Sequence, residues 1–126
     1  MKNLEISKTK TTPEILFNFS KNELSITGES FPENTSEFYA PVFEWLEEYL
    51  DTLSDQLVTV NIELVYFNSS SSKVLMDLFD MLEESVQNGK EISVNWRYDE
   101  DNEMAAEYGE DFMEDLEHLP FHLVEI

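Results

Sequence analysis

The 126-residue sequence contains no cysteine, only three glycines and only two histidines. The absence of cysteine excludes disulfide bonds, cysteine-ligated zinc sites and cysteine nucleophiles. The glycines are too few for a phosphate-cradling loop (Gly28, Gly89 and Gly109). A catalytic serine would need a base, yet both histidines lie in the last segment (His118 and His122), and no Gly-x-Ser-x-Gly motif occurs. We therefore expect a protein that is not an enzyme.

Basic residues are also scarce, because 7 lysines and arginines stand against 28 aspartates and glutamates, a formal net charge of −21. This balance argues against nucleic acid as a ligand, since phosphate binding needs clustered Lys and Arg. It argues equally against an anionic membrane surface. No apolar run approaches the ~18 residues of a membrane span. Residues 1–10 carry no apolar signal segment, so we expect a cytoplasmic protein.

What the sequence does contain is enough apolar material for a core. Hydrophobic residues make up 41% of the chain and aromatic residues 13%, which argues against disorder. The length fits a single domain, and we predict one domain over residues 1–126. Residues 1–13 are polar and end at Pro13, and we interpret them as a loosely ordered lead-in.

Alternation of apolar and polar residues predicts strands near 15–19, 24–28, 57–67, 92–98 and 121–126. Apolar residues at three-to-four spacing predict helices near 35–53, 71–88 and 101–118. The fold class is thus α/β with a mixed sheet, in the order β-β-α-β-α-β-α-β. Pro41 predicts either a helix that begins close to it or a separate turn over 35–40 with a kink. The apolar pair Val65 and Phe67 suggests that strand 57–67 deepens into the core at its end.

A run of serines separates the longest strand from the second helix. Asn68 and Ser69–Ser72 precede Lys73, the only basic residue between Lys21 and Lys90. A helix N-terminus carries free N–H groups and the positive end of the dipole, which favour a phosphate. Two interpretations stay open: one of the serines caps the helix, as serines commonly do, or one of them is a regulated phosphosite.

The third predicted helix is strongly acidic, with ten Asp and Glu residues between Asp99 and Glu117. Such a face is either simply solvated or a docking surface for a basic partner. The segment lacks the glycine and the final glutamate of an EF-hand loop. Pro120 lies between His118 and His122 and breaks the helix that a metal pair at this spacing would need. We therefore expect no metal and no cofactor.

Four stretches of the chain resemble a known family. They are Ser30–Asn34, Trp45 within an acidic helix, Val65–Lys73 followed by Met76–Glu84, and Trp96–Asp99 with Asn102 and Glu103. Together they are similar to the SiaC-type regulatory phosphoproteins of bacteria. The middle block is the most specific part, and the resemblance runs from about Thr12 to Asp115.

The resemblance implies a fold like that of anti-sigma-factor antagonist (STAS-like) domains and a partner-switching role in biofilm regulation. It implies a dedicated serine/threonine kinase with a histidine-kinase-like ATPase fold, and a PP2C-type phosphatase that reverses its action. It also implies that the unmodified form binds and activates a diguanylate cyclase, the source of cyclic di-GMP. By position the phosphosite falls on Ser69, with Ser70 and Ser71 as chemically equivalent alternatives.

The contact surface for the partner is expected on the second helix and the loop before it. The candidate residues are Asn68, Lys73, Met76, Asp77 and Asp80. The loop Phe31–Asn34 is a weaker candidate for the same surface. The alternatives are a constitutive acidic docking protein and an antagonist-type module with a different output partner.

Overall fold

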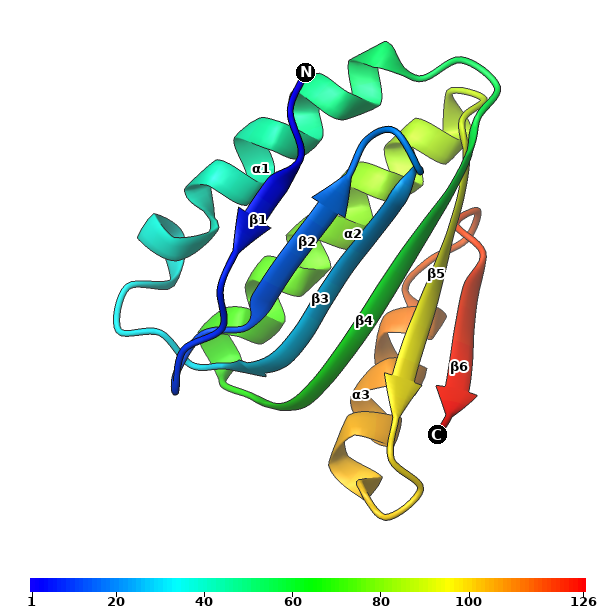
Figure 1. Cartoon of the computed structure of the whole chain (residues 1–126). Coiled ribbons are helices and arrows are strands. Elements are labelled where there is room, and N and C mark those ends of the chain that lie inside the picture. Colours follow the sequence, from blue (N-terminus) through cyan, green and yellow to red (C-terminus); the bar gives the residue numbers. More distant parts are fainter.

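Six strands form one mixed sheet in which the strands lie side by side in chain order (Figure 1). The computed structural model describes all residues, 1–126. The strands are β1 (Leu4–Ile6), β2 (Glu14–Asn18), β3 (Glu23–Ser30), β4 (Leu57–Phe67), β5 (Glu91–Tyr98) and β6 (Phe121–Glu125). The first three pair antiparallel, and β3 to β6 pair parallel. The predicted mixed sheet is therefore confirmed.

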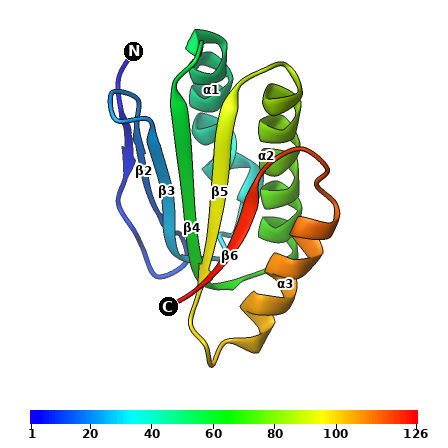
Figure 2. The ribbon, with the colours of Figure 1, turned by 90° about the vertical axis from the view of Figure 1, so that its right-hand side faces the viewer.

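Each parallel pair of strands is joined through a helix, as parallel connections require. The helices are α1 (Thr35–Thr52), α2 (Ser69–Gln87) and α3 (Glu103–Glu114). All three cover one side of the sheet (Figure 2). The chain leaves β3, β4 and β5 at the same end of the sheet, so the amino ends of the three helices gather there (Figure 1). None of the helices is long and apolar enough to cross a bilayer.

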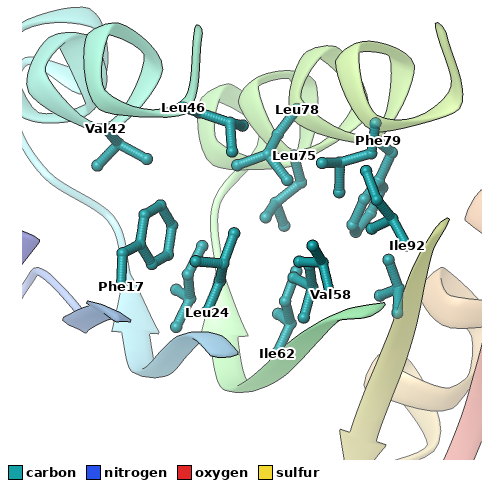
Figure 3. Packing of buried hydrophobic residues seen from close by; sticks show 14 of the residues in the cluster. Phe17, Leu24, Val42, Leu46, Val58, Ile62, Leu75, Leu78, Phe79 and Ile92 are labelled. Carbon is teal, nitrogen blue, oxygen red and sulfur yellow. The ribbon is translucent and has the colours of Figure 1, made fainter. Parts of the chain in front are cut away.

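The core lies between the sheet and its helical layer. Inward-facing residues of the strands alternate with exposed ones, as in β4, where Val58, Val60, Ile62 and Leu64 are buried. Figure 3 shows the residues that fill the space between the layers. Those of the strands include Phe17, Leu24, Val58, Ile62 and Ile92, and those of the helices include Val42, Leu46, Leu75, Leu78 and Phe79. This core fixes α1 and α2 side by side on the sheet.

The prediction of a loosely ordered lead-in is wrong. Residues Leu4–Ile6 form β1, which pairs with β2 in a register that sets Leu4 opposite Phe17. The indole N–H of Trp45 in α1 also donates a hydrogen bond to the carbonyl of Lys2, at 2.6 Å. The element order therefore gains a strand, β-β-β-α-β-α-β-α-β. Three residues carry too little periodicity to be recognised, and only the partner strand makes them a strand.

Both interpretations of Pro41 are wrong as well, because α1 is one helix that begins at Thr35. Asn34 caps it, with its Oδ1 accepting from the N–H of Glu37 at 3.0 Å. Pro41 itself is exposed, whereas Tyr39 and Val42 beside it are buried. Packing of these neighbours on the core holds the helix through a residue that by itself would interrupt it.

Strand β4 does not deepen evenly into the core. Its pairing with β3 shifts between Gly28 and Glu29, which lie opposite Leu64 and Tyr66. Val65 is therefore an extra residue, a β-bulge, and the bulge reverses the alternation of inward and outward side chains. As a result Val65 is 59% exposed and Tyr66 43% exposed, whereas Phe67 is only 4% exposed. The bulge changes the direction of the end of β4, and therefore the position at which α2 begins.

Candidate functional site

The candidate site begins with Asn68, the residue between β4 and α2. Its backbone is extended, and its Oδ1 accepts a hydrogen bond from the N–H of Ser71 at 2.9 Å. Its own N–H donates to the carbonyl of Ser30 at the end of β3. Asn68 is thus the helix cap, and the expectation that one of the serines caps α2 is wrong. The capping role leaves the serine hydroxyls free for other contacts.

The four serines have different surroundings. Ser69 and Ser70 are exposed, Ser72 is half-buried, and Ser71 is completely buried. The hydroxyl of Ser71 lies 2.8 Å from the hydroxyl of Ser30, which in turn lies 2.7 Å from the phenol oxygen of Tyr39. Ser71 is therefore unavailable to a kinase in the folded domain, which argues against this alternative phosphosite. Ser69 and Ser70 stay as predictions.

Tyr39 closes this buried chain of hydroxyl groups from the side of α1. Burial raises the pKa of its phenol, and the hydrogen bond with Ser30 partly opposes that effect. The phenol is therefore neutral at physiological pH and keeps its O–H. This chain of hydroxyl groups joins three elements, α1, β3 and α2, and it ends at Ser71 in the first turn of α2.

A shallow groove of about 440 Å³ lies between the amino ends of α1 and α2. It is lined by Glu33, Asn34, Thr35, Ser36, Ser70, Lys73, Val74 and Asp77. The structure thus places the loop before α1, the weaker candidate from the sequence, beside the start of α2. The first turns of both helices and the exposed Lys73 border the groove, and Lys73 pairs with no carboxylate.

The other candidate contact residues lie further along α2. Lys73, Asp77 and Asp80 are exposed, whereas Met76 is half-buried and packs against the core. Partial burial raises the pKa of Asp80, and the nearby carboxylates of Asp77, Asp115 and Glu83 raise it further. The exposed side of α2 therefore carries concentrated negative charge below its serine-rich start. Such a surface suits a partner with basic residues.

The acidic third helix is shorter than predicted and ends at Glu114. Beyond it, Glu83 of α2 accepts hydrogen bonds from three successive backbone N–H groups, those of Glu117, His118 and Leu119. These bonds hold residues 117–119 in a bend. A helix that continued to residue 118 would have to break them. His118 and His122 are both exposed, and the structure holds no group of three His, Asp or Glu side chains placed to bind a metal.

Sequence reasoning missed Ser30, Tyr39 and Glu83. Ser30 had a detectable signal, because it continues the inward alternation of Leu24 and Ile26 and so places a hydroxyl toward the core. Tyr39 and Glu83 had none, since their partners lie 9 residues and more than 30 residues away along the chain.

Both the sequence and the fold match those of known proteins. The family model of the SiaC family regulatory phosphoproteins matches residues 6–126. The chain belongs to the SiaC family of regulatory phosphoproteins. The resemblance of the central block around Asn68 is thereby confirmed as membership of that family.

Individual relatives agree with this assignment. The chain is 39% identical over 121 residues to an uncharacterised protein of Pseudomonas aeruginosa strain UCBPP-PA14, covering 96% of this chain and 94% of that protein. The structure of SiaC of Pseudomonas aeruginosa superposes with a TM-score of 0.90 at 36% identity over the full length of both chains. A third match is a crystal structure of the diguanylate cyclase SiaD in complex with its activator SiaC, also from Pseudomonas aeruginosa. It has a TM-score of 0.91 at 37% identity, covering 98% of this chain and 99% of that one.

Proposed function

We propose that this SiaC-family chain is a non-enzymatic partner-switching protein of the cytoplasm whose unphosphorylated form binds and activates a diguanylate cyclase. The observation that carries the proposal is the match to an activator solved in complex with its cyclase, at a TM-score of 0.91 over 98% of this chain. A backbone this similar presents the same helices at the same end of the sheet. The exposed, acidic side of α2 supports a contact with a basic surface of the cyclase.

The switch is phosphorylation of Ser69 by a kinase with a histidine-kinase-like ATPase fold, reversed by a PP2C-type phosphatase. Its support is local geometry. Asn68 caps α2, so the exposed Ser69 is not needed for the cap. A phosphate there lies at the positive end of the helix dipole, with Lys73 one turn further on. The STAS-like character of the domain belongs to the same proposal.

The phosphate acts on the contact rather than on the fold. It adds about 1.5 to 2 negative charges at neutral pH, and it adds them to the loop and helix start that face the partner. In this proposal the partner surface fits the unmodified serine hydroxyl and has no pocket for a phosphate. The phosphate must lose its hydration and it holds the two surfaces apart by its bulk, so binding loses affinity while the domain itself stays folded.

The test combines mass measurement with cyclase activation. The chain is incubated with its kinase and MgATP, its intact mass is measured, and both forms are titrated into the diguanylate cyclase. We expect one added phosphate, loss of activation, and recovery of activation after treatment with the phosphatase. Binding of the unmodified form is expected to weaken as salt rises, because charge steers it.

Two variants locate the site. Ser69→Ala is expected to resist the kinase and to activate the cyclase constitutively, whereas Ser70→Ala, which changes a neighbour that is also exposed, is expected to behave like the wild type. If Ser69→Ala still takes up one full phosphate, the phosphosite is Ser70. A phosphorylated wild-type protein that still activates the cyclase would instead favour the alternative of a constitutive acidic docking protein.

A further inference from the structure

A kinase that acts on the serine run has to modify one serine among several neighbours. Four consecutive serines offer a kinase four chemically equivalent hydroxyls, from Ser69 to Ser72. The first turn of a helix also has the weakest internal hydrogen bonding, since its leading N–H groups have no partner within the helix. A turn that opened would present all four serines in extended form.

Three contacts hold this turn closed. The Oδ1 of Asn68 accepts from the N–H of Ser71, and its carbonyl accepts from the N–H of Ser72 at 2.9 Å. The third contact comes from outside the helix, where the hydroxyl of Ser30 lies 2.8 Å from that of Ser71. Ser30 is fully buried and is itself held by the phenol of Tyr39 at 2.7 Å. The tether therefore reaches from α2 through β3 to α1.

Burial makes this tether costly to break. Ser30 and Ser71 are fully buried, and a buried hydroxyl that loses its partner costs the full penalty of an unsatisfied polar group. The tether also fixes the rotation of the first turn, because it holds Ser71 inward. Ser69 and Ser70 then face outward, at 200° and 100° of helical rotation from Ser71 by the geometry of about 3.6 residues per turn.

We propose that Ser30 and Tyr39 are positioning residues that select the phosphoacceptor by holding Ser71 inside the domain, so that only the outward-facing serines before it reach the kinase. This inference rests on the proposed function, because it concerns the same modification. It adds two residues distant in sequence that touch neither the kinase nor the phosphate. Their role is exercised entirely through the buried hydroxyl of Ser71.

The test uses three variants of the full chain: Ser30→Ala, Tyr39→Phe and, as a matched control, Tyr49→Phe. Tyr49 is also a buried tyrosine of α1, but its phenol donates to Asn22 at the other end of the helix, at 2.6 Å. All three variants lose one buried hydroxyl. Only the first two lose it from the tether, so a general loss of stability cannot mimic the expected result.

Two readouts are measured on each variant. Hydrogen exchange at the amides of Ser71 and Ser72 reports opening of the turn without any kinase. We expect it to accelerate about five- to tenfold in Ser30→Ala, the factor that corresponds to one lost hydrogen bond, and less in Tyr39→Phe. Fragmentation mass spectrometry after treatment with the kinase and MgATP locates the phosphate. We expect phosphate on Ser71 in Ser30→Ala and none there in the wild type or in Tyr49→Phe.

The outcomes separate the two proposals. If the wild type takes up no phosphate, the proposed function fails. If the wild type takes up one phosphate and Ser30→Ala places it on the same serine, the selection by Ser30 and Tyr39 is overturned while the proposed function stands. Unchanged amide exchange in both tether variants, relative to Tyr49→Phe, overturns the tether itself.

Discussion

Helices α2 and α3 begin in the same way but carry different charge at their first turn. Each follows a parallel strand and is capped by an asparagine, Asn68 for α2 and Asn102 for α3, whose Oδ1 accepts from an N–H at 2.9 and 3.1 Å. The first turn of α3 contains Glu103, whereas that of α2 contains no acidic residue. In a chain with 28 acidic residues, this leaves the positive end of α2 without compensation. A phosphate at the start of α2 would therefore be stabilised more by the helix dipole than a phosphate at the start of α3.

The two helices also pack differently. α2 buries the large side chains of Leu75, Leu78, Phe79 and Leu82. α3 buries Ala105, Gly109 and Phe112, and its backbone lies close enough for the Trp96 indole N–H to donate to the carbonyl of Ala105 at 2.9 Å. A broad apolar stripe anchors α2, so the exposed Ser69 in its first turn can change charge without loosening the helix. The attachment of α3 depends instead on the close approach of its backbone to the side chains of the sheet.

The largest effect is expected from removing that close approach. In Gly109→Ala, the new methyl group would lie 2.5 Å from Cδ1 of Trp96 and 2.8 Å from Cδ2 of Leu123. We expect the free energy of unfolding to fall by about 1–3 kcal/mol, the usual cost of overpacking. Urea denaturation measures it, with Glu110→Ala on the exposed side of α3 as control. Equal stability of the two variants would contradict close packing as the anchor of α3.

A smaller effect is expected from Glu83, which connects α2 to the chain beyond α3. Glu83→Gln leaves one acceptor oxygen for N–H groups that now lie 2.6 to 2.7 Å from a carboxylate. We expect a loss of about 1–2 kcal/mol at pH 7. The exposed neighbour provides the control, Glu84→Gln, which is expected to leave stability unchanged.

This loss is also expected to depend on pH. Burial tends to raise the pKa of Glu83, but the hydrogen bonds from the backbone of Glu117, Leu119 and His118 outweigh it and lower the pKa. A lowered pKa in the folded state stabilises the protein above the unfolded value near 4.5. The difference between wild type and Glu83→Gln is therefore expected to shrink as the pH falls below 4.5 through the lowered pKa. A difference constant from pH 7 to pH 3 would refute the carboxylate as the cause.

Removing either cap tests the asparagine capping that α2 and α3 have in common. Asn68→Ala and Asn102→Ala are each expected to cost about 1 kcal/mol. Asn102 should cost the more of the two, because its side-chain N–H₂ also donates to the carbonyl of Val65 at 3.0 Å. Thermal unfolding measures both, and Asn68→Asp, which keeps the capping oxygen, serves as the control. A stable Asn68→Ala would mean that another residue caps α2.

The smallest effect tests the difference in charge directly. Ser69→Asp adds an acid to the first turn of α2, and we expect it to stabilise the domain by about 0.3–1 kcal/mol at low salt. Glu103→Gln removes the acid of α3 and is expected to lose a similar amount. High salt should reduce both effects. A lower melting temperature for Ser69→Asp would contradict the view that the fold tolerates a phosphate there.

The periodicity of the sequence predicted the three helices and the five longer strands, because each of these has one face turned to the core. It also predicted a helix start within the serine run, near residue 71, and the structure begins α2 at Ser69. It did not reveal that Asn68 is the cap, although asparagine is as good a cap as serine, since four adjacent hydroxyls offered equivalent candidates. Which of the four serines is buried was decided by the position of Ser30 on β3, beside Ser71.

The sequence by itself therefore determined the element types, the mixed α/β class and the negative charge, which depend on local periodicity and composition. Only the tertiary structure decided which short segments become strands, as in β1, where the bulge falls, as at Val65, and that α1 runs through Pro41. It alone decided that Ser71 points inward and Ser69 outward. The reason is physical: a buried hydroxyl is fixed by partners distant in the chain, and here they come from β3 and α1.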